Sequence, residues 1–219
     1  MDIVIVVSAG NYDHCEATGA SPGELRRAYP RCLLTPAARV IEPAIPANAL
    51  TVGALAGAGV PHRAQDRGPR RIAPAPIARP DEPSPFTRGG FGVGGAIKPE
   101  VVEHGGNWSY GAKNDRLHRG DKGLGVVTLS HHHDDRRLFA VDRGTSMATP
   151  RVAHLAARIL QRYPDASANL VRALIAHSCQ VPAPLARLPL SGEECLRLVG
   201  YGRPGAERAL HSTDNRVVM

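Results

Sequence analysis

The sequence predicts an α/β domain with a mostly parallel sheet, and three observations indicate this fold class. Residues 3–7 form a continuous β-branched run ahead of Ser-Ala-Gly-Asn, a pattern typical of a strand buried on both faces of a parallel sheet. Apolar side chains recur at helical spacing from residue 149 onward. Glycine-rich segments separate the apolar runs from the helical ones, and this alternation favours helices packed in layers on a sheet.

Length and composition limit the alternatives. A chain of 219 residues suffices for one domain with its own core, whereas two full domains would be cramped. Apolar residues make up 42% of the chain and aromatic residues only 4%, so Val, Leu, Ile and Ala must fill the core. The formal net charge is +7, but 24 of the 27 basic residues are Arg, scattered among Ala, Pro and Gly. Because no basic stripe is interleaved with aromatic residues, we expect no nucleic-acid partner.

Further strands follow the first one along the chain. The run ALTVGALAG at 49–57 predicts a second buried strand, and shorter strand patterns occupy 100–103, 125–130 and 137–142. A short helix is expected near 24–28, after the turn signal Ser-Pro-Gly. In chain order, these runs supply the strands that the predicted sheet requires.

Two intervening segments have turn-rich compositions. Residues 58–85 contain seven prolines among many arginines, which excludes a helix or a central strand and predicts a surface loop or insertion. Residues 84–107 are rich in glycine but have neither the GxxxxGK[ST] pattern nor a helical pattern behind them. We therefore expect no phosphate-binding loop there, and the sequence predicts no cofactor.

Two helices are predicted in the C-terminal third. The first ends at Pro164, and Pro150 places its start near residues 146–149, because proline is tolerated in a first helical turn. The second is expected at 167–178, with an apolar face of its own. The apolar face of the first helix comprises Val152, Leu155, Ala156, Ile159, Leu160 and Tyr163.

Cysteine spacing and hydropathy exclude several further classes. The four cysteines have no CxxC spacing, which argues against a zinc ribbon or a thioredoxin-type motif, and they are too few to predict a disulfide framework. No apolar run approaches the roughly 18 residues that a membrane span requires, so no membrane partner is expected. The N-terminal run lacks a basic region and a cleavage site, which excludes a signal peptide.

The stretch GTSMATP at 144–150 places Ser146 at the predicted start of a helix. Unpaired N–H groups and the positive end of the helix dipole stabilise negative charge there, and small neighbours let a carbonyl group approach, which suits a nucleophile. Ser and Thr are also favoured helix N-caps, so Ser146 or Thr145 could serve only to satisfy an unpaired donor. The stretch alone leaves both interpretations open.

Several segments, in the same order along the chain, resemble the subtilisin-like serine peptidases, the subtilases. GTSMATP is similar to the active-serine motif of that family. VIVVSAGN at 4–11 resembles the strand that ends in its oxyanion-hole Asn, and ALTVGALA at 49–56 resembles the following core strand. SPFTRGG…IKPEVVEHGGN at 84–107 is similar to S-x-F-S-x-x-G…KPDVVAPG, and VGYGRPGAERAL at 199–210 to the closing G-x-G-x-x-x-A element. The resemblance implies a three-layer subtilisin-like fold over residues 1–219, incomplete at its N-terminus.

The resemblance also implies serine-type endopeptidase activity and gives roles to five residues. Ser146 would be the nucleophile that attacks the peptide carbonyl carbon and forms the acyl-enzyme. Asn11 would donate its side-chain amide to the oxyanion, together with the backbone N–H of Ser146. The backbone of Ser8, Ala9 and Gly10 would line the pocket for the substrate residue before the cleaved bond. Asn is also common in turns after strands, so Asn11 could be an ordinary turn residue. Its place after a Gly at the end of an apolar strand favours the oxyanion role.

The sequence contains no evident base for Ser146. A serine hydroxyl is a poor nucleophile until a base accepts its proton, and a third group must hold that base in one tautomer. The family takes its Asp from a D-T/S-G strand end and its His from an H-G-T-H helix, both upstream of the Asn motif, and neither pattern occurs here. The chain also opens directly on a core strand, so we expect the upstream part of the domain to be missing.

The ten histidines offer no clear substitute. In SHHHDD at 130–135, the first and third histidines share one face of an extended segment while the second does not, so we expect a polar loop and no metal site. His154 and Arg151 stand where the family usually has Gly and His. His154 is eight residues past Ser146, about 12 Å along the helix axis, and cannot reach it directly.

Three functional interpretations follow. In the first, the chain is the C-terminal half of a serine endopeptidase that acts on a peptide or protein substrate, and it is inactive without the missing Asp and His. In the second, it is a catalytically inactive remnant that binds peptide segments or a partner by strand pairing at a sheet edge. In the third, another chain supplies the Asp and His. Intact Ser146 and Asn11 favour the first, because a remnant has no physical reason to keep both.

Overall fold

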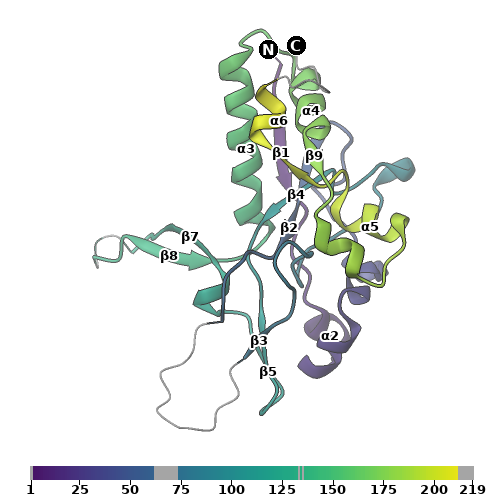
Figure 1. Ribbon diagram of the computed structural model, residues 1–219, viewed down its shortest axis with the longest axis vertical. Helices are drawn as coiled ribbons and strands as arrows, with labels where there is room; N and C mark the ends of the chain where they lie inside the picture. Colours follow the sequence, from purple (N-terminus) through teal and green to yellow (C-terminus); the bar gives the residue numbers. More distant parts are fainter. Residues whose placement is uncertain (1, 62–73, 133, 135, 212–219) are drawn as a thin grey trace.

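The computed structural model describes residues 2–61, 74–132, 134 and 136–211 and confirms the α/β class (Figure 1). Its centre is a three-stranded parallel sheet in the order β1–β2–β4. The strands are β1 Ile5–Ser8, β2 Ala49–Leu55 and β4 Val101–His104. All seven residues of β2 are buried, as the apolar run at 49–57 predicts.

The first strand differs from the prediction in its burial. The sequence predicts a strand with both faces covered, but β1 is only partly buried, and Ile5 is 45% exposed. The physical reason is its position: within the described residues β1 pairs only with β2, so it forms an edge of the sheet. One side of this strand therefore has no neighbour in the part of the chain that the structure describes.

Helix α3, Thr145–Arg162, packs against all three strands of the sheet (Figure 1). Val152, Leu155, Ala156 and Ile159 are buried, which confirms the predicted apolar face. The sequence predicts Pro150 in the first turn of this helix. The helix begins at Thr145, however, so Pro150 lies in the second turn. Since proline has no N–H, the carbonyl of Ser146 lacks its usual helical partner.

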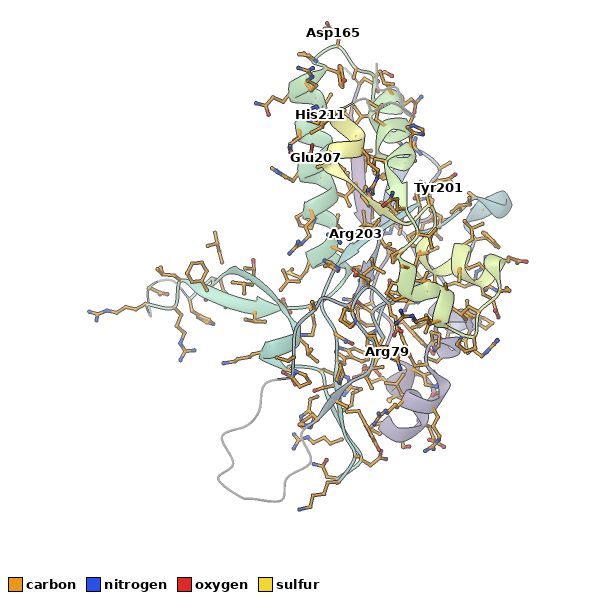
Figure 2. All side chains as sticks on the ribbon, in the orientation of Figure 1. Arg79, Asp165, Tyr201, Arg203, Glu207 and His211 are labelled. Carbon is orange, nitrogen blue, oxygen red and sulfur yellow. The ribbon has the colours of Figure 1, made fainter. Side chains whose placement is uncertain are left out.

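The remaining helices cover the flanks of the sheet. The predicted second C-terminal helix is confirmed as α4, Ala168–His177, and it packs against α3. Helix α6, Ala206–Leu210, contacts both, and Figure 2 shows its Glu207, and His211 just after the helix, beside α3. The other helices are α1 His14–Thr18, α2 Pro22–Ala28 and α5 Gly192–Val199, with 3₁₀ turns at Arg31–Leu34, Pro36–Ala38, Val93–Gly95, Lys122–Leu124 and Ala183–Arg187. No helix in the described residues is long and apolar enough to span a bilayer.

Short antiparallel strands lie outside the central sheet. The predicted strands at 125–130 and 137–142 are confirmed as a two-stranded hairpin, β7 Val126–Leu129 and β8 Phe139–Asp142. The others are β3 Ala75–Pro76, β5 Ser109–Gly111 and β6 Arg116–His118 in one sheet, and β9 Cys179–Gln180 with β10 Arg203–Pro204 in another. In Figure 1 the β7–β8 hairpin projects from the body on the side of the N-terminal end of α3.

Part of the predicted loop at 58–85 is built into the core. Residues 62–73 lie outside the described residues, but Ile77 is buried and joins the hydrophobic core together with Phe86 just beyond the segment. The buried Ser84 hydroxyl donates to the carbonyl of Gly106 at 2.6 Å. Of the described positions, only residues 75–76 form a strand, at the end of a small sheet, as the prolines predict.

None of the four cysteines forms a disulfide within the described residues, and Cys32 is the most deeply buried of them. Burial raises the pKa of Cys32 to about 12, because a low-dielectric surrounding disfavours the thiolate. Since the thiolate is the reactive form, we expect folded protein at pH 8 to resist alkylation at Cys32, whereas protein unfolded in urea reacts. Peptide mapping by mass spectrometry after iodoacetamide treatment checks this, and equal labelling in both states would contradict it.

Candidate active site

The end of β1 and the start of α3 meet through two side chains that lie far apart in the sequence. The Oδ1 atom of Asn11 accepts a hydrogen bond from the backbone N–H of Thr145 at 3.0 Å and another from the Thr145 hydroxyl at 3.3 Å. The Thr145 hydroxyl in turn accepts the N–H of Gly10 at 3.2 Å. The carboxyl end of a parallel strand is thereby fixed to the N-terminus of a helix.

These bonds determine which way the Asn11 amide faces. A backbone N–H can only donate, so the atom opposite Thr145 must be the oxygen, and the Nδ2 donor is directed elsewhere. A Cβ atom placed on Gly144 would lie 3.0 Å from Nδ2, so the amide nitrogen sits against the residue that precedes the helix. Ser146, two positions further, is exposed. An amide donor and an accessible serine hydroxyl therefore lie at the same helix start.

The backbone N–H groups of α3 add to this arrangement. The first N–H groups of a helix have no partner within the helix, and they favour negative charge. Thr145 N–H is used by Asn11, and Met147 N–H bonds to the carbonyl of Gly144. Among the described residues, the N–H and the hydroxyl of Ser146 have no hydrogen-bond partner. The geometry can thus offer one backbone and one side-chain donor to an oxyanion, the chemistry that acyl transfer requires.

Neighbouring backbone contacts hold the two ends in place. The N–H of Gly144 donates to the carbonyl of Gly105 at 2.9 Å, which ties the helix start to the end of β4. The Nε atom of Arg88 donates to the carbonyl of Asn11 at 3.1 Å, and Asn11 forms an isolated antiparallel bridge with Thr87. The site is therefore assembled from the ends of two strands, a helix and the 84–90 segment.

The predicted pocket residues lie next to this arrangement. Ser8 is the last residue of β1, and Ala9 is fully buried, with its N–H donating to the carbonyl of Val52. Gly10 adopts a φ of +92°, which L side chains rarely adopt. Surface cavities of about 560 and 520 Å³ are lined by other residues. The substrate-binding role of these three residues remains a prediction.

A histidine–carboxylate pair that the sequence did not single out lies at the end of β4. His104 Nε2 is 2.7 Å from Asp81 Oδ1, and Arg203, labelled in Figure 2, is 3.9 Å from the same oxygen. The only sequence signal was the His of VEHG, where the family pattern has Pro. Within the described residues this pair makes no hydrogen bond to Ser146.

The polar segment between β7 and β8 forms no metal centre in its described part. The rings of His131 and His132 have centroids 3.7 Å apart and are tilted by 42° to each other, and both residues are exposed. The prediction that the first and third histidines share one face involves residue 133, which lies outside the described residues. In residues 2–61, 74–132, 134 and 136–211, no three His, Cys, Asp or Glu side chains gather as metal ligands.

Gly144 is expected to be essential for the geometry of this site. Its φ of +144° and ψ of 165° belong to a region that only glycine populates readily. We expect Gly144→Ala to cost about 1–3 kcal/mol of stability and to displace the Asn11 amide. Urea unfolding measures the loss, with Gly192→Ala as control, because a Cβ at Gly192 meets no atom within 4 Å. Equal stability of the two variants would contradict the expectation.

The fold and the order of the sequence motifs are those of one known protein family. The chain belongs to the subtilase family, whose model, described as "Subtilase family", matches residues 1–202. It is 42% identical over 223 residues to "Uncharacterized protein y4bN" of Sinorhizobium fredii (strain NBRC 101917 / NGR234). That match covers 100% of this chain and 50% of the relative, so the chain spans about half the length of the curated relative.

Solved structures of peptidases share the fold. A lanthipeptide protease superposes with a TM-score of 0.51 at 18% identity, over 95% of this chain and 50% of that chain. The epidermin leader peptide processing serine protease of Staphylococcus aureus gives a TM-score of 0.51 at 17% identity, over 98% and 42%. The chain thus matches about half the length of these subtilisin-like proteases. The match confirms the mixed α/β fold with a parallel sheet.

Proposed function

We propose that this chain is the nucleophile-bearing half of a subtilisin-like serine endopeptidase. Ser146 attacks the carbonyl carbon of a peptide bond, the carbonyl oxygen becomes the oxyanion, and the Asn11 amide and the Ser146 N–H donate to it. The observation that carries the proposal is the contact between Asn11 and Thr145 across 134 positions of the sequence, which leaves Nδ2 free to face the reacting atoms. Family membership and the peptidase folds of the structural relatives support it.

The proposed reaction needs a second polypeptide segment. No described residue accepts the Ser146 proton, so an Asp and a His must come from a complementary segment, whether in the same polypeptide or in another one. In subtilisin, loss of the His alone costs about as much turnover as loss of the whole triad, near 10⁶. We therefore propose that this chain by itself hydrolyses peptides at most very slowly.

Fluorophosphonate labelling tests the proposal, because only an activated serine reacts with the probe. The chain alone should remain unlabelled. Co-expression with the half of the Sinorhizobium relative that it does not match should give a labelled band, with the adduct on Ser146 by peptide mapping. Ser146→Ala should abolish the label. A co-expressed pair that forms a complex but never takes up the probe would refute the peptidase assignment.

A non-enzymatic binding module is the second candidate, and one observation favours it. The edge strand β1 exposes Ile5 and pairs on one side only within the described residues, so an extended segment could add to it by strand pairing. A remnant of this kind would bind the complementary half without Ser146 ever becoming reactive. The labelling experiment therefore separates the two candidates.

A further inference from the structure

The β7–β8 hairpin has one wholly apolar face. The strand register pairs Val127 with Val141 and Leu129 with Phe139, so these four side chains lie on the same face. The opposite face carries Val126, Thr128, Ala140 and Asp142. The hairpin is therefore amphipathic, as expected of a strand pair that packs one face against a core.

Three of these four apolar side chains are open to solvent. Val127 is 65% exposed, Leu129 78% and Phe139 69%, and in Figure 1 the hairpin projects away from the sheet and the helices. A two-stranded hairpin is marginally stable in water unless a third strand or a packed partner covers its apolar face. A contiguous exposed apolar face of this kind marks an interaction surface.

The hairpin leads directly into the candidate active site. Strand β8 ends at Asp142, two residues before Gly144, and α3 starts one residue later. The bond from the Gly144 N–H to Gly105 anchors this junction to the central sheet. A polypeptide packed on the hairpin therefore lies beside the segment that carries Ser146.

We propose that the apolar face of the β7–β8 hairpin is the docking surface for the complementary half of the peptidase domain, the polypeptide that carries the Asp and the His. This inference rests on the proposed function. The match to the Sinorhizobium relative covers all of this chain, yet half of that relative lies outside it. The lanthipeptide protease is likewise twice as long as its matched part. Both proteins therefore contain a further segment of about this chain's own size.

A second copy of this chain fits the same surface less well. Two hairpins packed face to face would bury the apolar side chains, but a second copy carries the same residues and adds no new base for Ser146. The complementary half covers the same side chains and supplies the groups that the chemistry lacks. Docking at the hairpin thus links assembly of the domain to activation of Ser146.

Co-purification of the tagged chain with the co-expressed, unmatched half of the relative tests the docking surface. We expect Leu129→Ser/Phe139→Ser to lower recovery of the partner at least tenfold and to abolish fluorophosphonate labelling. The matched control Val93→Ser/Val181→Ser changes two exposed apolar residues outside the hairpin and should leave both unchanged. Ser146→Ala should keep the partner and lose only the label.

Each outcome has one meaning. Circular dichroism and urea unfolding of the hairpin variant alone should match those of the unaltered chain, because the replaced side chains are exposed. If the hairpin variant recovers the partner as well as the control does, or if the unaltered chain recovers none, the docking surface is wrong. A concentration-dependent dimer of the chain alone that the hairpin variant abolishes would assign the surface to a second copy. Hairpin-dependent recovery without any labelling would retain the docking surface and refute the peptidase assignment.

Discussion

Replacing Lys98 with Met lowers the free energy of unfolding by about 3–5 kcal/mol, because the change leaves buried partners without a donor. The Lys98 side chain is 1% exposed, and its ammonium donates to the carbonyls of Pro46 and Ala49 at 2.9 and 2.8 Å. It also donates to the Thr51 hydroxyl and forms a 2.7 Å ion pair with Glu100. One side chain therefore ties the start of β2 to the loop before it and to the residues just before β4.

Two control variants isolate the cause of this loss. Lys113→Met removes an exposed lysine and should change stability by less than about 0.5 kcal/mol. Lys98→Met combined with Glu100→Gln should cost less than Lys98→Met alone, since the partly buried Glu100 carboxylate, which loses its 2.7 Å cation in the single variant, is then replaced by a neutral amide. Urea unfolding measures all three. A double variant that is less stable than the single one would show that lost packing, and not the unpaired charge, dominates.

On the proposed oxyanion role of Asn11, we expect Asn11→Asp to leave the fold intact but to lower the turnover of the chain co-expressed with its complementary half by about 10² to 10³. That magnitude is the one measured for loss of the corresponding amide in subtilisin. A carboxylate keeps the oxygen that accepts from Thr145, so the strand end stays attached to α3. It removes the Nδ2 donor that the proposed mechanism directs at the oxyanion.

The comparison with Asn11→Ala separates anchoring from catalysis. Alanine removes both the acceptor and the donor. This variant should therefore lose about 1–3 kcal/mol of stability, and it should lose turnover as well. Thermal unfolding and initial rates of peptide hydrolysis are measured on the same preparations. If Asn11→Asp keeps full turnover, Asn11 is a structural anchor, and the oxyanion assignment fails.

Hydrophobic periodicity predicted the central elements because local pattern and burial agree there. Strand β2 and helices α3 and α4 lie where the apolar spacing places them. Helix α1 was not predicted, since it is five residues long, buries no residue and is marked only by its caps, Asp13 and Gly19. The exposure of Ile5 could not be predicted either, because a β-branched run reads the same at an edge as in the centre of a sheet.

The candidate site was predicted in part. Motif order placed Asn11 and Ser146 together in advance, and the structure does bring the Asn11 side chain to the residue before Ser146. The orientation of the amide depends on a bond across 134 positions, which no local pattern contains. The burial of Lys98 was equally hidden, because lysine is almost always exposed and two of its four partners are backbone carbonyls, which no sequence pattern marks.

The initial rate of peptide hydrolysis, with and without the complementary half, tests the central claim most directly. We expect the purified chain alone to be indistinguishable from its Ser146→Ala variant. Co-expression with the unmatched half of the Sinorhizobium relative should raise the rate at least 10³-fold, and Ser146→Ala should remove that gain. Hydrolysis by the chain alone that Ser146→Ala abolishes would contradict the account, and so would a stable pair with no activity above background.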